Sequence, residues 1–173
     1  MNETLIKNWN DKIRQTDVTY FLGDLLWKNT NTSSETIREL VFRLNGTIHL
    51  ILGNHDKKDI ISPIRDRFAT IQQIKEIKID NQPITLCHYA MLSWNKSHYG
   101  AWQLFGHSHG VLNHIAETQK NLLRSTQMDC GLDTSNYIPY SFEEIRTKIK
   151  EKEEVFQTQY PETQIQGKLD EVR

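Results

Sequence analysis

Four apolar runs along the chain have the length and composition of β-strands, and each leads directly into a short polar block. Valine, isoleucine, leucine and aromatic side chains dominate these runs, which favours buried strands. The runs span residues 18–22, 47–52, 83–86 and 102–105. We therefore expect an α/β (α+β) domain over residues 1–155, followed by a polar C-terminal tail over 156–173 that carries no chemistry.

Helices are expected around the first two strands. The spacing of Thr32 and Glu35 is that of a capping box, which starts a helix that Asn45 and Gly46 end. The order strand, helix, strand favours two neighbouring parallel strands. Before them, residues 2–15 carry apolar residues at helical spacing, namely Leu5, Ile6, Trp9 and Ile13.

The second half of the chain predicts a short helix, a strand pair and a final helix. The short helix lies around residues 58–68 and is disturbed by Pro63. Residues 71–79 alternate apolar and polar side chains, and with residues 83–87 they predict antiparallel strands joined by a turn at Asn81 and Gln82. One or two late strands are expected within 122–132, and the spacing of Ser141 and Glu144 starts a charged helix to about residue 155.

Composition sets limits on partners and compartment. The chain has 173 residues, which suits one domain with its own core. Its formal net charge of -1 creates no basic field, so strong nucleic-acid binding is not expected. No apolar run has transmembrane length and no signal peptide is recognisable, so we expect a cytoplasmic protein without membrane contact. Cys87 and Cys130 are expected to be reduced thiols.

The polar blocks after the four strands contain the residue types of a hydrolytic divalent-metal centre. Open α/β sheets place their sites beyond the carboxyl ends of strands, so the blocks are expected to converge on one crevice. Aspartate, asparagine and histidine are the oxygen and nitrogen ligands of such centres. The candidate ligands are Asp24, Asn54, His88, His107 and His109.

Neighbouring residues in these blocks suggest separate roles. His55 follows Asn54 and is expected to point at a substrate, where it could protonate a leaving alkoxide. Asp56 could orient that imidazole. If the segment around His107 and His109 is extended, both rings project to one face and can bind two neighbouring metals about 3.5–4 Å apart.

A long aromatic loop over residues 89–101 follows His88 and is expected to shape a substrate pocket. Trp94 and His98 are its candidate substrate-binding residues. Three groups outside the blocks are expected to play other parts: His49 in the core, His114 on the surface, and Asp129 and Asp133 in turns or in indirect support of the site.

These blocks resemble the calcineurin-like metallophosphoesterases, and the Trp in the loop after His88 resembles the small bacterial and phage members. The family pattern is D-x-H, G-D, G-N-H-[DE], a lone His and G-H-x-H, and four of its five blocks stand in order within residues 1–145. The resemblance implies a β-sandwich flanked by helices and two divalent ions, usually Mn, Fe, Zn or Ni. It makes His55 the catalytic acid and Asp56 its orienting partner. Asp24 would bridge the ions, with Asn54, His88 and His107 on one ion and His109 on the other.

The first block of the family pattern is absent, because no D-x-H occurs before Asp24. In family terms the first strand is missing, and the second metal keeps only Asp24 and His109, which predicts weak binding there. Three explanations are open: a gene or start codon that cuts the chain short, a degenerate one-metal relative, or a strand supplied by another chain.

The function expected from these residues is metal-dependent hydrolysis of a phosphomonoester or phosphodiester, with reduced activity in the isolated chain. The alternative is a non-catalytic, protein-binding scaffold, against which the intact His55, His107 and His109 argue. A structural zinc protein fits poorly because the candidate ligands are dispersed and no thiolate cluster is present. A small phosphate ester is the expected substrate, and a homo-oligomer is left open.

Overall fold

Two β-sheets and five α-helices make up the part of the chain that the computed structural model describes, residues 2–26, 33–118 and 122–159. The first sheet has the order β1 (Val18–Phe21), β2 (Thr47–Ile51), β3 (Phe68–Gln72), and all its pairs are parallel. The second has the order β4 (Ile74–Ile79), β5 (Gln82–Cys87), β6 (Trp102–Phe105), β7 (Gln127–Asp129). In it β4 and β5 are antiparallel, while β5, β6 and β7 are parallel. This mixed α/β architecture confirms the predicted fold class.

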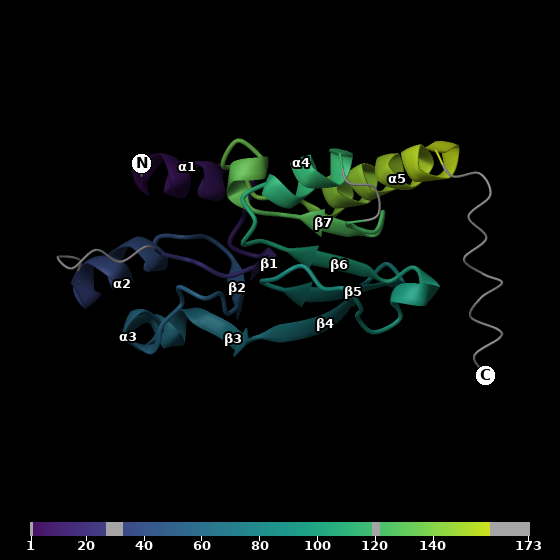
Figure 1. Ribbon diagram of the computed structural model, residues 1–173. Helices are drawn as coiled ribbons and strands as arrows, with labels where there is room; N and C mark the ends of the chain where they lie inside the picture. The colour runs from purple at the N-terminus through teal and green to yellow at the C-terminus, as the bar shows by residue number, and fades with distance from the viewer. Residues whose placement is uncertain (1, 27–32, 119–121, 160–173) are drawn as a thin grey trace.

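The two sheets pack against each other through apolar side chains. Ile51, with Tyr20 and Leu22 beside it, contacts Leu86 and Leu104 from the second sheet in one buried cluster. A second cluster joins the first sheet to the helices α1 (Asn2–Lys12), α2 (Ser34–Phe42) and α3 (Lys58–Ile61). Figure 1 shows α2 and α3 beside the first sheet, whereas α4 (Val111–Thr118) and α5 (Phe142–Gln159) lie along the second.

The parallel crossover between β1 and β2 forms as predicted, but its helix begins one residue later than the capping pattern suggested. The N-cap of α2 is Ser33, whose Oγ accepts a hydrogen bond of 3.1 Å from the backbone N–H of Thr36. Thr32, the predicted cap, lies outside the described residues. The later helix breaks where Pro63 was expected to disturb it: α3 ends at Ile61, and a 3-10 segment, Ser62–Arg67, follows.

The alternating run over residues 71–79 was predicted as one strand and is divided between two. β3 ends at Gln72 in the first sheet and β4 begins at Ile74 in the second. The antiparallel pairing of β4 with β5 is confirmed, although its turn lies at Asp80 and Asn81, whose φ angles are both positive. One strand, β7, forms within the late segment 122–132, where one or two were predicted. The sequence pattern did not predict the helix α4.

The last helix starts at the predicted capping box. The backbone N–H of Ser141 donates to Glu144 Oε2 over 2.7 Å, and Lys12 of α1 donates to Glu144 Oε1 over 2.7 Å. The Lys12 hydrogen bond, aided by the donors of Ser141, lowers the pKa of Glu144 to about 2. α5 continues to Gln159, so residues 156–159 of the predicted tail are helical.

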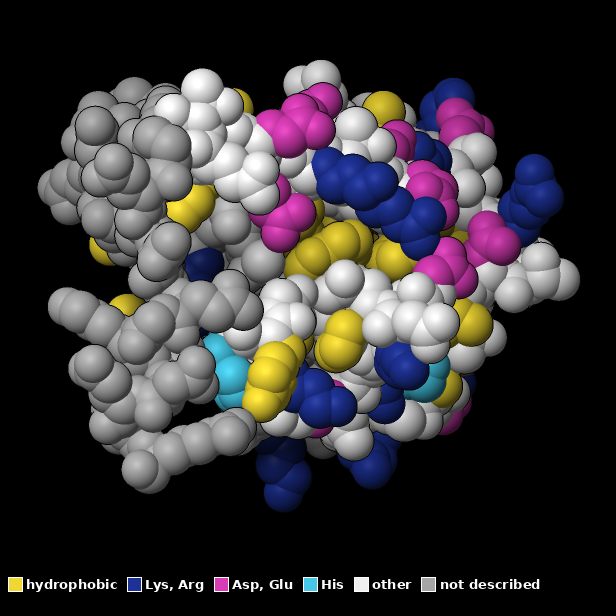
Figure 2. Space-filling model, turned by 90° about the vertical axis from the view of Figure 1, so that its right-hand side faces the viewer, with side chains coloured by type: hydrophobic (Ala, Val, Ile, Leu, Met, Phe, Trp, Pro, Cys, Tyr) yellow, Lys and Arg dark blue, Asp and Glu magenta, His cyan; other side chains and the backbone are white. Residues whose placement is uncertain are grey.

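Charges of both signs cover the helix that ends the described chain. Along the upper part of the face in Figure 2, where α5 lies, Lys and Arg side chains are interspersed with Asp and Glu. None of the described helices is long and apolar enough to cross a membrane.

Candidate metal centre

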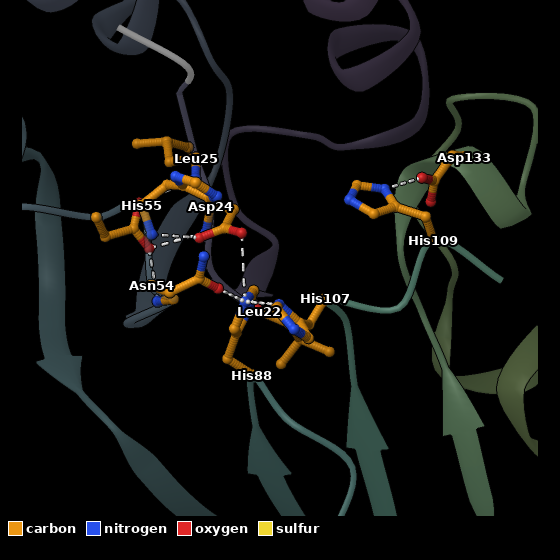
Figure 3. A network of polar contacts seen from close by, with 11 residues as sticks. Leu22, Asp24, Leu25, Asn54, His55, His88, His107, His109 and Asp133 are labelled. Atoms are coloured by element: carbon orange, nitrogen blue, oxygen red, sulfur yellow. Dashed lines mark hydrogen bonds and ion pairs between the residues drawn. The ribbon is translucent and has the colours of Figure 1, made fainter. Parts of the chain in front are cut away.

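The loops that follow β1, β2, β5 and β6 bring four of the five predicted ligands together (Figure 3). His88 Nε2 lies at the middle of the group. It is 3.0 Å from Asn54 Oδ1, 3.2 Å from His107 Nδ1 and 3.3 Å from Asp24 Oδ2. These four side chains are called the ligand group below. The convergence predicted from the strand ends is therefore present for Asp24, Asn54, His88 and His107.

The protonation of His88 follows from its other ring nitrogen. His88 is buried, with 1% of its surface exposed, and Nδ1 lies 2.7 Å from the carbonyl oxygen of Leu22. A carbonyl can only accept, so Nδ1 carries the proton and donates it. In the neutral ring, Nε2 then carries a lone pair, which points toward the neighbouring atoms of Asp24, Asn54 and His107.

The Asp24 carboxylate, the Asn54 amide oxygen and the unprotonated Nε2 of His88 are acceptors that a cation among them would stabilise. A four-coordinate ion with bonds of about 2.0–2.1 Å separates its ligand atoms by about 3.3 Å. The contacts of His88 Nε2, at 3.0, 3.2 and 3.3 Å, match that spacing. Nitrogen and oxygen donors of this kind suit Mn, Fe, Ni or Zn. The ligand group thus fits one divalent ion.

Close contact between two glycine loops fixes Asp24. A Cβ atom at Gly53 would lie 2.3 Å from Asp24 Oδ1 and 2.6 Å from the Asp24 nitrogen. At Gly23, a φ of +94° excludes other residues without strain. The backbone N–H of His55 donates to Asp24 Oδ1 over 2.8 Å, so Oδ2 is the oxygen directed at His88.

Asp56 makes bonds that the sequence did not predict, and its expected role in orienting His55 stays a prediction. Its buried carboxylate accepts backbone hydrogen bonds from Asp24 at 2.8 Å, Leu25 at 3.0 Å and Gly53 at 2.8 Å. These bonds tie the loop after β1 to the loop after β2, a role the sequence reasoning missed. The aspartate that ends the Gly-Asn-His-Asp block, a strong acceptor beside a turn, was the available signal. That His55 is a general acid stays a prediction.

His107 and His109 do not share a face, because the segment between them is not extended. Their φ angles are 65° and 49°, which turn the backbone at each histidine. His109 Nδ1 hydrogen-bonds Asp133 and stands away from the ligand group (Figure 3). The premise that this segment is extended is therefore wrong, whereas metal binding by His109 stays a prediction. Gly106 and Gly110, which flank the pair, were the signal for a turn.

Both aspartates near the end of the second sheet support this turn, as expected. Asp129 is buried and accepts hydrogen bonds from the Ser108 hydroxyl and from the backbone N–H of Gly110 at 3.0 Å. Asp133 holds His109. The turn over residues 106–110 is thus stabilised by side chains from β7 and from the short 3-10 segment that follows it.

The two predicted substrate-binding residues make contacts within their own loop, and their part in substrate binding stays a prediction. Trp94 is buried, and its indole N–H donates to the Ala101 carbonyl over 2.9 Å, so it closes its own loop rather than offering a surface. His98 is exposed and lies against Tyr99, with ring centroids 4.1 Å apart. His49 was expected in the core; it is half-buried and hydrogen-bonds Thr70 at 2.7 Å, and burial lowers its pKa.

An open cavity of about 630 Å³ runs along β1 and ends at the ligand group. Among the described residues β1 is an edge strand and pairs only with β2. We call this space the β1 cavity. Its walls include Asp24, His107 and His109 at one end. Apolar side chains from α1, the second sheet and α5 line the rest, among them Leu5, Trp9, Ile77, Ile79, Leu86 and Ile145.

Comparison with known proteins points to one family. A family model described as calcineurin-like phosphoesterase matches residues 2–107. An uncharacterised protein of Methanocaldococcus jannaschii is 33% identical over 158 residues, which cover 91% of this chain and 80% of that protein. A crystal structure of a protein of unknown function from Aquifex aeolicus has a TM-score of 0.61 and 20% identity, over 84% of this chain and 83% of that one. This last similarity extends to the fold alone.

Proposed function

Because the chain belongs to the calcineurin-like phosphoesterase family, we propose that it hydrolyses phosphomonoesters or phosphodiesters with one divalent ion held by the ligand group. The family is metal-dependent, which fits the chemistry of these four side chains. The observation that carries the proposal is the set of acceptor atoms 3.0–3.3 Å from His88 Nε2. Of these side chains only His88 is buried, so the group opens to solvent, where an ion could enter.

Each residue has a distinct part in the proposed reaction. A divalent ion bound here supplies Lewis acidity and favours deprotonation of water near phosphorus. The Leu22 carbonyl keeps His88 in the tautomer that leaves Nε2 unprotonated. The His55 backbone N–H orients the Asp24 carboxylate. The attacking water releases a proton to solvent as its oxygen bonds to phosphorus, the ester P–O bond breaks, and His55 gives a proton to the leaving oxygen.

We propose that manganese is one of the ions that support turnover, because oxygen and nitrogen ligands without a thiolate suit Mn, Fe, Ni and Zn alike. A second ion would find only Asp24 and His109 among the predicted ligands. The contact of His109 Nδ1 with Asp133 leaves the other ring nitrogen for a metal, so this second position would have two side-chain ligands, against four in the ligand group. We expect one tightly held ion and reduced activity of the isolated chain.

We also propose that an extended segment of another polypeptide docks in the β1 cavity. The free edge of β1 offers backbone donors and acceptors to an added strand. Apolar walls lie on both sides of that edge, toward α1 and toward the second sheet. A strand placed there would end beside Asp24 and His109, where side-chain ligands are few.

A non-catalytic, protein-binding scaffold is the second candidate, and the open β1 cavity is the observation that favours it. The ligand group argues against it, because a docking surface gains nothing from four converging acceptor atoms. A purified protein that holds no metal and takes up none when manganese is added would support the scaffold.

Hydrolysis of p-nitrophenyl phosphate and bis(p-nitrophenyl) phosphate with added Mn²⁺ tests the proposed activity. We expect turnover that a chelator abolishes and that falls about 100-fold in Asp24→Asn, since loss of a metal-site interaction typically costs 10–100-fold. Asp66→Asn makes the same chemical change at an exposed ion pair with Arg38 and serves as the matched control. Equal turnover in Asp24→Asn and Asp66→Asn would contradict the proposal.

A further inference from the structure

We propose that Tyr89 is a positioning residue, which holds the His107 ring in the orientation that binds metal, and that the buried amides of Gln103 and Gln127 hold Tyr89 in place. The inference rests on the proposed metal site and adds to it a residue outside the ligand group.

Three aromatic rings form a closed cluster at the ligand group. The Tyr89 ring centroid lies 4.8 Å from that of His107 and 4.9 Å from that of His88, with interplanar angles of 67° and 78°. The centroids of His88 and His107 are 5.0 Å apart at 67°. All three pairs are therefore edge-to-face, an arrangement that favours one ring orientation over others.

His107 depends on such contacts more than His88 does. His88 is buried and its Nδ1 is fixed by the Leu22 carbonyl. His107 is exposed and stands on a turn with a φ of 65°. The rings of His88 and Tyr89 flank it on two sides, so removal of the Tyr89 ring leaves one side open to rotation.

Two buried glutamines on neighbouring strands fix the backbone that carries Tyr89. Gln103 Nε2 donates to the Tyr89 carbonyl over 3.2 Å. Gln127 Nε2 donates to the Met91 carbonyl over 2.8 Å and to Gln103 Oε1 over 2.9 Å. Gln103 is 0% exposed and Gln127 2% exposed.

Amides buried in a sheet are costly unless hydrogen-bonded, and here their bonds go to the two residues that bracket Ala90. The adjacent positions, Leu104 and Met128, are apolar and belong to the core between the sheets. The glutamines therefore couple the interior of the second sheet to the stretch that directly follows His88. These bonds fix the backbone from which the Tyr89 ring extends to His88 and His107.

Cobalt binding to the full chain tests the proposal without an activity assay. Visible absorption of bound Co²⁺ reports both affinity and the ligands present. We expect Tyr89→Leu to weaken Co²⁺ binding about tenfold and to change the spectrum, as loss of an outer contact to a metal ligand does. Tyr89→Phe should bind as the unmodified chain does, because the contact is made by the ring. Tyr99→Leu, at an exposed tyrosine of the same loop, is the matched control.

A second measurement keeps this inference separate from the metal site itself. In the metal-free protein, the nuclear magnetic resonance signals of the His107 ring should shift in Tyr89→Leu and stay unchanged in Tyr99→Leu, with the amide signals of the first sheet preserved in both. Unchanged His107 signals and unchanged Co²⁺ binding in Tyr89→Leu would overturn the role of Tyr89. Co²⁺ binding that is equally absent from the unmodified chain and from Asp24→Asn would instead overturn the proposed metal site, and the role of Tyr89 with it.

Discussion

At the residue scale, the candidate site depends on the absence of a side chain at Gly53. A methyl group there would lie 2.3 Å from Asp24 Oδ1, 2.6 Å from the Asp24 nitrogen and 2.8 Å from His88 Cε1. The backbone nitrogen cannot move without the whole loop, so Gly53→Ala should displace Asp24. We expect Mn²⁺ affinity to fall about 10–100-fold, measured by calorimetric titration.

Gly100→Ala is the control for this change. No atom lies within 4 Å of a Cβ at Gly100, and its φ of +77° adds only backbone strain of about 1–3 kcal/mol, away from the ligand group. Circular dichroism of both variants establishes that they fold. Unaltered Mn²⁺ affinity in folded Gly53→Ala would show that the two glycine loops need not approach each other this closely.

The positions of single residues could be predicted from sequence where they depend only on which strand each residue follows. Asp24, Asn54, His88 and His107 follow strands whose carboxyl ends meet, so their convergence could be foreseen. The position of His109 could not, because it depends on two positive φ angles. The bonds of Asp56 depend on backbone donors from two loops, and those loops come together only in the folded chain.

At the element scale, the free edge of β1 and the apolar cavity beside it predict that an additional strand can pair with β1. A synthetic peptide in which an apolar, β-branched stretch precedes Asp-Ser-His is a suitable probe, and the same peptide ending in Asn-Ser-Ala is its control. We expect both to bind and to slow amide hydrogen exchange over Val18–Phe21, because each supplies partners to the free edge. Only the first should raise Mn²⁺-dependent hydrolysis.

Exchange at β1 that is unaffected by saturating amounts of either peptide would rule out strand addition at this edge. If both peptides slow exchange but give equal hydrolysis, the docking site stands, and the idea that the peptide's Asp and His contribute metal ligands is rejected.

Helices and strands were predictable where a local sequence signal marks them. They were less predictable where one alternating run is divided between two sheets. The crossover from β1 to β2 and the helix started by Ser141 and Glu144 follow from local signals. The run over 71–79 reads as a single alternating strand, yet it passes from the first sheet to the second at Gln73. That division is set by packing between sheets, which a local pattern does not contain.

At the scale of the whole molecule, parallel strands in both sheets direct their loops to one edge and bring the ligand group together there. The buried cluster between the sheets fixes their relative placement, so the first sheet contributes Asp24 and Asn54 and the second contributes His88 and His107. The ligand group exists only when both sheets are assembled. The family could be recognised from the order of its motifs, whereas the β1 cavity became visible only in three dimensions.

An anomalous difference map from crystals soaked in MnCl₂ tests the central claim most directly. We expect one strong manganese peak within coordination distance of Asp24 Oδ2, Asn54 Oδ1, His88 Nε2 and His107 Nδ1, since these acceptor atoms already converge. Manganese peaks elsewhere, with none at the ligand group, would contradict the account.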